Sequence, residues 1–301
     1  MSQATCSRFL DLRALAALEH MRFTTRHRID GAYSGRHRSR QQGGAGEFVE
    51  YREYTGGEDL RRVDWKVFGR TGKAFVRLHQ DETNLRCTVA IDASGSMAFR
   101  GGNKGAASKL EYAQFLATAL SHLIGRSQDQ VGLAVLGEGL RQTLAPGSTL
   151  PHIRLVQSEV ERLRAESARR MATSLNQLFE RSSRRGVLLL ISDFLMDDLQ
   201  ELIAALRLFR HRGWEVIALH LVHPDEERLP AGTAFRFEGM EADGAVACCP
   251  AEIRTAYEQQ FATHLGIVRQ LTLAIGVDYR LVSTAIPYLQ TLQGLLVERT
   301  G

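Results

Sequence analysis

The sequence predicts an α/β fold, with a doubly wound, mostly parallel sheet and a small β-rich N-terminal appendage. From residue 85 onward, apolar runs of strand length alternate with amphipathic stretches of helix length, which is typical of a parallel sheet covered by helices. Runs such as Val187–Ile191 also lack polar alternation, as expected of strands buried on both faces. We therefore assign residues 1–84 to an N-terminal helix, a basic glycine-rich loop and the β-rich appendage, and residues 85–301 to the α/β domain.

The N-terminal part contains three predicted segments. Phe9–Met21 has apolar residues at helical spacing, so we expect an amphipathic helix that covers the core. Arg26–Arg40 is basic and punctuated by glycine, and a solvated loop and a surface for an acidic partner both remain open. Glu47–Gln80 is expected to be β-rich, with Trp65 as a packing anchor. Its short strand candidates are Phe48–Val49, Tyr51, Val63–Trp65 and Ala74–Val76.

The α/β part shows a regular succession of elements. Strands are predicted at Cys87–Ile91, Gln130–Leu136, Gly186–Ser192, Trp214–Val222 and Val277–Val282, with Leu140–Leu144 as an edge strand and Phe235–Val246 as a hairpin insertion. Helices are predicted at Lys109–Ile124, Ile153–Leu163, from Thr173 onward, Leu199–Gly213, Ala251–Gly276 and Tyr288–Val297. This alternation favours one doubly wound sheet over separate layers of strands and helices.

Polar side chains follow two of the predicted strands. Asp92, Ser94 and Ser96 come directly after the first strand, and Asp193 ends a later one. In open α/β sheets, ligands bind at the carboxyl ends of the strands. Two carboxylates and several hydroxyls make an all-oxygen site, which suits Mg²⁺ or Mn²⁺ and does not suit zinc or copper.

The motif Asp92-x-Ser94-x-Ser96, followed by methionine, resembles the metal-ion-dependent adhesion site of von Willebrand factor A-type domains. The resemblance implies that a threonine from a later loop and an acid at the end of a later strand complete the site. Thr173, in the sequence Thr-Ser-Leu, and Asp193 match these positions, although Thr173 also fits a helix N-cap. The metal ligands implied are Asp92, Ser94, Ser96, Thr173 and Asp193.

Further motifs resemble the signature of the domain of unknown function 58 family, and the resemblance covers nearly the whole chain. They are Gly44–Phe48, Tyr51–Tyr54, Gly57–Trp65 and Arg70–Thr71. The chain departs from the family pattern at Glu58, where Asp is usual, and at Gly69, where Ala is usual. The resemblance implies that the protein accompanies a MoxR-type AAA+ ATPase and acts as an adaptor in the assembly or activation of other complexes.

Three functions follow from these patterns. The first is a non-enzymatic, metal-dependent interaction module that binds a MoxR-type AAA+ ATPase or its client. The second is a serine hydrolase using Ser94, Asp193 and His220 or His223, but Asp92 occupies the first glycine position of the required Gly-x-Ser-x-Gly motif. The third is nucleic-acid binding through the basic N-terminal loop, which lacks a recognised nucleic-acid fold beside it. We expect the first.

Composition and charge fit a cytoplasmic protein. A net charge of +4 and a pI near 9.0 permit a nucleic-acid partner without demanding one. No apolar run approaches the roughly 18 residues of a membrane span, and Asp11 and Arg13 interrupt the N-terminal apolar segment, unlike a signal peptide. The four cysteines, Cys6, Cys87, Cys248 and Cys249, have no metal-ligand spacing. Cys87 belongs to a core strand and the vicinal pair is poorly placed for an ordinary disulfide, so we expect a reducing compartment.

Overall fold

The computed structural model describes most of the chain and divides it into two compact units. The described residues are 7–18, 21–24, 34–39, 47–55, 63–83, 85–102, 107–166, 170–182, 185–196, 198–230, 232, 235–241 and 244–300. One unit comprises Met1–Arg26 and Arg86–Gly301, and the other comprises His27–Leu85. Residues 1–26 therefore group with the α/β part, whereas the sequence analysis grouped them with the appendage. Residues 26–33 and 40 of the predicted basic loop, and residues 44–46 and 57–62 of the family motifs, lie outside the described residues. The described part of that loop, Ser34–Ser39, is a strand, so the loop prediction is wrong there.

The larger unit is built on a six-stranded sheet with the strand order β11-β8-β7-β4-β5-β6. Its strands are β4 (Arg86–Asp92), β5 (Gln130–Leu136), β6 (Leu140–Gly147), β7 (Val187–Ser192), β8 (Glu215–Val222) and β11 (Asp278–Ser283). All neighbours pair in parallel except β6, which runs antiparallel to β5 at one edge. The predicted α/β fold with a mostly parallel sheet is confirmed, including the edge strand.

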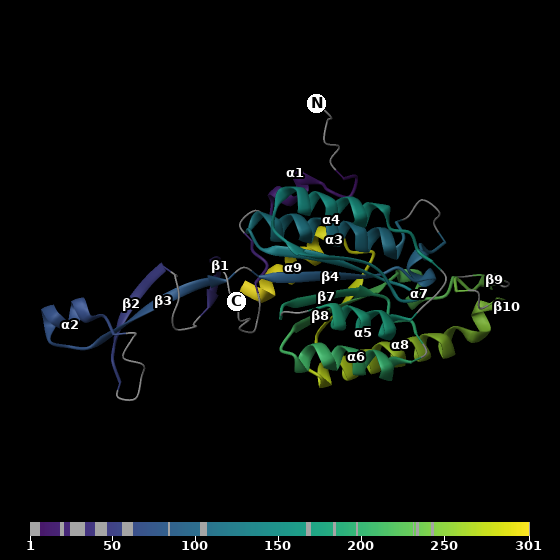
Figure 1. Ribbon diagram of the computed structural model, residues 1–301. Helices are drawn as coiled ribbons and strands as arrows, with labels where there is room; N and C mark the ends of the chain where they lie inside the picture. The colour runs from purple at the N-terminus through teal and green to yellow at the C-terminus, as the bar shows by residue number, and fades with distance from the viewer. Residues whose placement is uncertain are drawn as a thin grey trace, which may run out of the picture. The chain divides into compact units, whose positions relative to one another are not determined.

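Helices cover both faces of this sheet. They are α3 (Lys109–Arg126), α4 (Leu150–Arg162), α5 (Met171–Arg181), α6 (Leu199–His211), α8 (Pro250–Ala274) and α9 (Tyr288–Thr300). Figure 1 shows α3 and α4 on one side of the strands and α5, α6 and α8 on the other. Because both faces are covered, β7 and β8 are buried along their whole length, which explains their apolar sequences.

The N-terminal segment packs on the helical layer. Phe9, Leu15 and Leu18 are buried, and the ring of Phe9 meets that of Phe115 in α3 edge-on at 4.8 Å. The predicted helix over Phe9–Met21 is shorter in the structure, where α1 spans only Leu12–Ala16. The chain leaves the helix through i→i+3 bonds, in which Leu18 N–H donates to the Leu15 carbonyl and Met21 N–H to the Leu18 carbonyl.

The smaller unit contains an antiparallel sheet of order β1-β3-β2. Its elements are β1 (Ser34–Ser39), β2 (Glu47–Glu53), α2 (Trp65–Thr71) and β3 (Phe75–Thr83). The strand predicted at Val63–Trp65 is wrong, because the Asp64 carboxylate caps a helix by accepting from Lys66 N–H and Val67 N–H. Trp65 is 58% exposed and contacts the Phe68 ring edge-on, so it is not a buried packing anchor within this unit.

A two-stranded hairpin leaves the larger unit between β8 and α8. It consists of β9 (Phe235–Glu238) and β10 (Ala245–Cys248), which pair antiparallel. This confirms the hairpin insertion expected from the sequence. In the described part of the chain, no helix is long and apolar enough to cross a membrane.

Candidate functional site

Asp92 ends β4 with its side chain only 2% exposed, and both of its carboxylate oxygens are held. Oδ1 accepts the Ser94 N–H at 2.9 Å, and Oδ2 accepts the Ser192 hydroxyl at 2.6 Å. Ser192 belongs to the neighbouring strand β7. The carboxylate is therefore fixed at the carboxyl edge of the sheet by two elements.

Ser94 and Ser96 place two hydroxyls beside this carboxylate. Both side chains are buried, and their Oγ atoms are 3.2 Å apart. The chain turns here because a short 3₁₀ helix, Gly95–Ala98, begins directly after Ser94. The sequence spacing of one residue thus brings both hydroxyl oxygens to one place.

Asp193 follows β7 and completes what we call the oxygen rim, formed by Asp92, Ser94, Ser96 and Asp193. Its Oδ1 accepts the Leu195 N–H at 3.1 Å. Burial favours the neutral acid, but the Lys109 ammonium and hydrogen bonds, one of them from Ser96, hold the pKa of Asp193 below its usual value. The predicted convergence of the two strand-ending acids is present in the structure.

Lys109 is one residue of the site that the sequence patterns did not single out. Its side chain is 0% exposed, and its Nζ donates to Asp193 Oδ2 at 2.7 Å and also to Glu226 of α7 (Pro224–Glu227). Burial disfavours the charged amine, but the two carboxylates more than offset this and raise the pKa of Lys109. A lysine at the first position of α3 is disfavoured by the helix dipole. This unfavourable position is the one feature of the sequence that indicates a special role for Lys109.

The acids around the rim outnumber the base. Asp92, Asp193 and Glu226 carry three carboxylates, and Lys109 supplies one ammonium. Burial first, and repulsion from Asp193 second, raise the pKa of Asp92 to about 6. The site therefore retains negative charge that a further cation would neutralise.

Thr173, the remaining ligand that the resemblance implies, belongs to α5. It is exposed in the first turn of α5, which begins at Met171 with Arg170 as its N-cap, so the N-cap interpretation of Thr173 is wrong. The next residue, Ser174, is buried and donates its hydroxyl to the Gly137 and Arg170 carbonyls. No hydrogen bond within the described residues joins Thr173 to the oxygen rim, and its role as a ligand stays a prediction.

The two histidines of the hydrolase alternative have other partners. His220 is buried in β8, where its Nδ1 lies 2.8 Å from the Tyr279 hydroxyl, and burial lowers its pKa to about 3. His223 Nδ1 accepts the Asp225 N–H at 3.1 Å. The acid of the postulated triad, Asp193, is paired with Lys109. The hydrogen bonds of these residues therefore give the triad no support.

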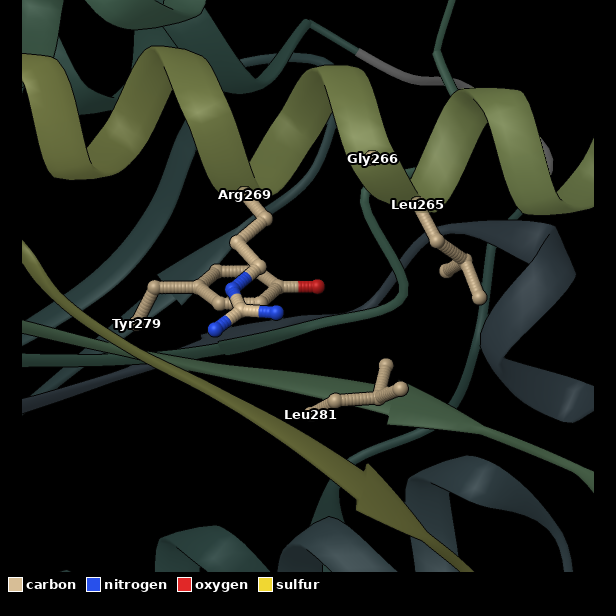
Figure 2. A pocket seen from close by; sticks show the side chains of 5 residues that line it. All are labelled: Leu265, Gly266, Arg269, Tyr279 and Leu281. Carbon is tan, nitrogen blue, oxygen red and sulfur yellow. The ribbon is translucent and has the colours of Figure 1, made fainter.

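A separate hollow of about 310 Å³ lies between α8 and the edge strand β11 (Figure 2). It is lined by Leu265, Gly266, Arg269, Tyr279 and Leu281. Figure 2 shows Leu265 and Arg269 reaching from the helix and Tyr279 and Leu281 from the strand. Because its lining shares no residue with the oxygen rim, this hollow is a distinct feature of the molecule.

Comparison with known proteins identifies the family. Residues 50–266 match the family described as protein of unknown function DUF58. The chain belongs to the DUF58 family. Uncharacterized proteins of Mycobacterium bovis and Mycobacterium tuberculosis are 28% identical to it over 233 residues, covering 73% of this chain and 68% of theirs. Residues 50–266, which match the family, include β4, β5, β7 and β8 and the whole oxygen rim.

Solved structures related to this DUF58 chain are distant. BatB from Bacteroides thetaiotaomicron is 15% identical, with a TM-score of 0.46 over 72% of this chain and 99% of that one. An aerotolerance-related membrane protein from Bacteroides fragilis is 17% identical, with a TM-score of 0.44 over 71% of this chain and 100% of that one. The SpRpn10 VWA domain is 10% identical, with a TM-score of 0.40 over 70% and 94%.

Proposed function

We propose that this protein is a non-enzymatic interaction module whose oxygen rim holds one Mg²⁺ or Mn²⁺ ion. The observation that carries the proposal is the buried excess of carboxylates, three against the single ammonium of Lys109. Burying unpaired carboxylates is costly unless a cation compensates them. An ion at the rim would remove this cost.

The oxygen atoms of the rim fit a small divalent ion. Metal–oxygen bonds of 2.0–2.1 Å in an octahedron separate neighbouring ligands by about 2.9 Å, and the Ser94 and Ser96 hydroxyls are 3.2 Å apart. Asp92 lies beside them as the anionic ligand. The Lys109 ammonium already pairs with Asp193 Oδ2, whereas Asp92 accepts from the neutral Ser94 N–H and Ser192 hydroxyl, so Asp193 would act mainly through water.

The proposed partner is a protein with an exposed acidic side chain. Two neutral hydroxyls and one carboxylate leave a bound divalent ion electron-poor, so an incoming Glu or Asp would complete its oxygen shell. The family resemblance supplies the class of partner, a MoxR-type AAA+ ATPase or its client. The cytoplasm is the compartment in which we place this pairing, and Cys87, Cys248 and Cys249 are free thiols, as expected there.

The test is affinity purification of the tagged chain in Mg²⁺ and in chelator, with the retained proteins identified by mass spectrometry. We expect a MoxR-type ATPase or its client to be retained only with Mg²⁺ and to be lost in Ser96→Ala. Ser121→Ala is the matched control, because Ser121 is also buried but donates to the Thr118 carbonyl within α3. Retention that survives both chelator and Ser96→Ala would contradict the proposal, as would labelling of Ser94 by a fluorophosphonate probe.

A further inference from the structure

The hairpin turn between β9 and β10 brings a carboxylate to the oxygen rim. Glu241 Oε1 accepts the Ser96 N–H at 3.3 Å, across a sequence separation of 145 residues. Ser96 is one of the four rim residues. The hairpin therefore presents at the rim the same chemical group that the proposed partner would supply.

The contact depends on a close approach of two backbones. A Cβ atom on Gly95 would lie 2.2 Å from the Met240 carbonyl oxygen and 3.1 Å from Glu241 Cγ. Gly95 is not among the described glycines with a positive φ, so its own backbone conformation does not demand glycine. Glycine is required at this position because the hairpin turn lies too close for a side chain. The segment that carries Ser94 and Ser96 and the hairpin turn are therefore in direct contact.

Glu241 adds negative charge where carboxylates already exceed bases. Its carboxylate is held at the Ser96 N–H, at an edge of the rim that already contains more acids than bases. With a divalent ion on the rim, the same placement becomes favourable, because Glu241 would then meet a positive charge. The position of Glu241 therefore suits an ion on the rim that its carboxylate would help to hold.

The hairpin is also weakly attached. Each of its strands has four residues, and three of the four side chains in each are exposed. A two-stranded hairpin with so little apolar burial is marginally stable and opens at low cost. The turn that carries Glu241 can therefore leave the rim while the sheet stays folded.

We propose that Glu241 is an internal acidic ligand of the ion on the oxygen rim. It occupies the coordination position that the proposed partner would use, until the partner's carboxylate displaces it. The inference rests on the proposed function, since it requires an ion on the rim. It adds that, in the free protein, Glu241 of the hairpin blocks the coordination position that the partner would use. Partner binding therefore competes with Glu241.

The experiment measures Mn²⁺ binding to the full chain by the enhancement of water-proton relaxation. In Glu241→Ala we expect Mn²⁺ affinity to fall by about tenfold, which is the scale of a lost supporting ligand. We also expect the relaxation enhancement per bound ion to rise, because water takes the vacated position. Glu238→Ala is the matched control: it removes the same charge from the same hairpin, and Glu238 is exposed, 3.7 Å from Arg236.

Three outcomes would contradict this inference, and only one of them also contradicts the proposed function. If Glu241→Ala binds Mn²⁺ with the affinity and enhancement of the wild type, while Asp92→Ala does not bind it, Glu241 is not a ligand and the rim still is a metal site. If the wild type binds no Mn²⁺ at the rim, both proposals are overturned. Equal effects of Glu238→Ala and Glu241→Ala on Mn²⁺ binding would show that only the net surface charge of the hairpin matters. That result would also overturn the inference.

Hydrogen exchange of residues 235–248 supplies a second readout. Mn²⁺ should slow exchange in the wild-type hairpin, because the ion fastens Glu241 to the rim, and should leave the hairpin of Glu241→Ala unchanged. A hairpin whose exchange ignores Mn²⁺ in the wild type would overturn the inference.

Discussion

Lys109 Nζ lies 2.7 Å from Asp193 Oδ2, and the two side chains are 0% and 2% exposed. This buried ion pair joins the first residue of α3 to the end of β7 and fixes one side of the oxygen rim. Lys109 also pairs with Glu226, so one ammonium holds two acids that burial would otherwise penalise.

Replacing this ammonium should destabilise the fold strongly. In Lys109→Met, Asp193 and Glu226 lose their cation inside the protein, and we expect a loss of about 3–5 kcal/mol in the free energy of unfolding, measured with urea. Arg162→Ala is the control, because its pair with Glu159 is at the surface and should change stability by less than about 1 kcal/mol. Equal losses of unfolding free energy in the two variants would show that the buried ion pair stabilises the fold no more than a surface pair.

Asp92→Asn should stabilise the ion-free protein. The pKa of Asp92 is raised in the folded state from 3.8 to about 6, so ionised Asp92 opposes folding above that pH and does not oppose it below pH 3.8. At pH 8 in chelator, we expect the neutral amide to add about 1–2 kcal/mol, after the loss of one accepted hydrogen bond. The same variant should abolish the stabilisation by Mg²⁺. Lower stability of Asp92→Asn in chelator would contradict this electrostatic account.

His220 predicts acid sensitivity of the α/β unit. Its pKa is about 3 in the folded state against 6.5 for a free histidine, so the unfolded chain binds a proton first and stability is lost as the pH falls below 6.5. The loss due to this group at pH 5 is about 2 kcal/mol. His220→Gln should lower the difference in unfolding free energy between pH 7.5 and pH 5 by that amount. An unchanged difference would rule out this role for His220.

Gly95→Ala should detach the hairpin turn from the rim. The new methyl group would collide with the Met240 carbonyl, so we expect residues 235–248 to exchange their amide hydrogens faster while β4 and β7 keep their protection. Gly102→Ala is the matched control in the same loop, since its nearest neighbour would lie 4.0 Å away. Equal exchange in both variants would show that the turn does not depend on Gly95.

The sequence was sufficient to predict the sheet and the meeting of the two acids of the oxygen rim. Asp92 and Asp193 could be brought together because parallel strands end at one edge, and the uninterrupted apolar runs revealed which strands are buried. Lys109 and Glu241 could not be found in this way. Their contacts span 84 and 145 residues of sequence and depend on how a helix start and a hairpin turn are placed in space, which no local period encodes.

The wrong predictions at Val63–Trp65 and Thr173 arose because neighbouring residues decide where a helix begins and ends. At Val63–Trp65, strand-forming residues yield to a helix because Asp64 caps it and Gly72, at φ 68°, ends it. At Thr173, a good capping residue lies two positions inside the helix, since α5 begins at Met171 without a side-chain cap. Propensity at one residue was outweighed in both cases by the neighbours that define the helix ends.

Calorimetric titration of the ion-free chain with Mn²⁺ tests the metal-holding rim most directly. We predict weak binding of one ion to the wild type and to Ser121→Ala, and a loss of that binding in both Asp92→Ala and Ser96→Ala, each confirmed to be folded. Binding that is absent from the wild type at millimolar Mn²⁺, or unchanged in Asp92→Ala, would contradict the account.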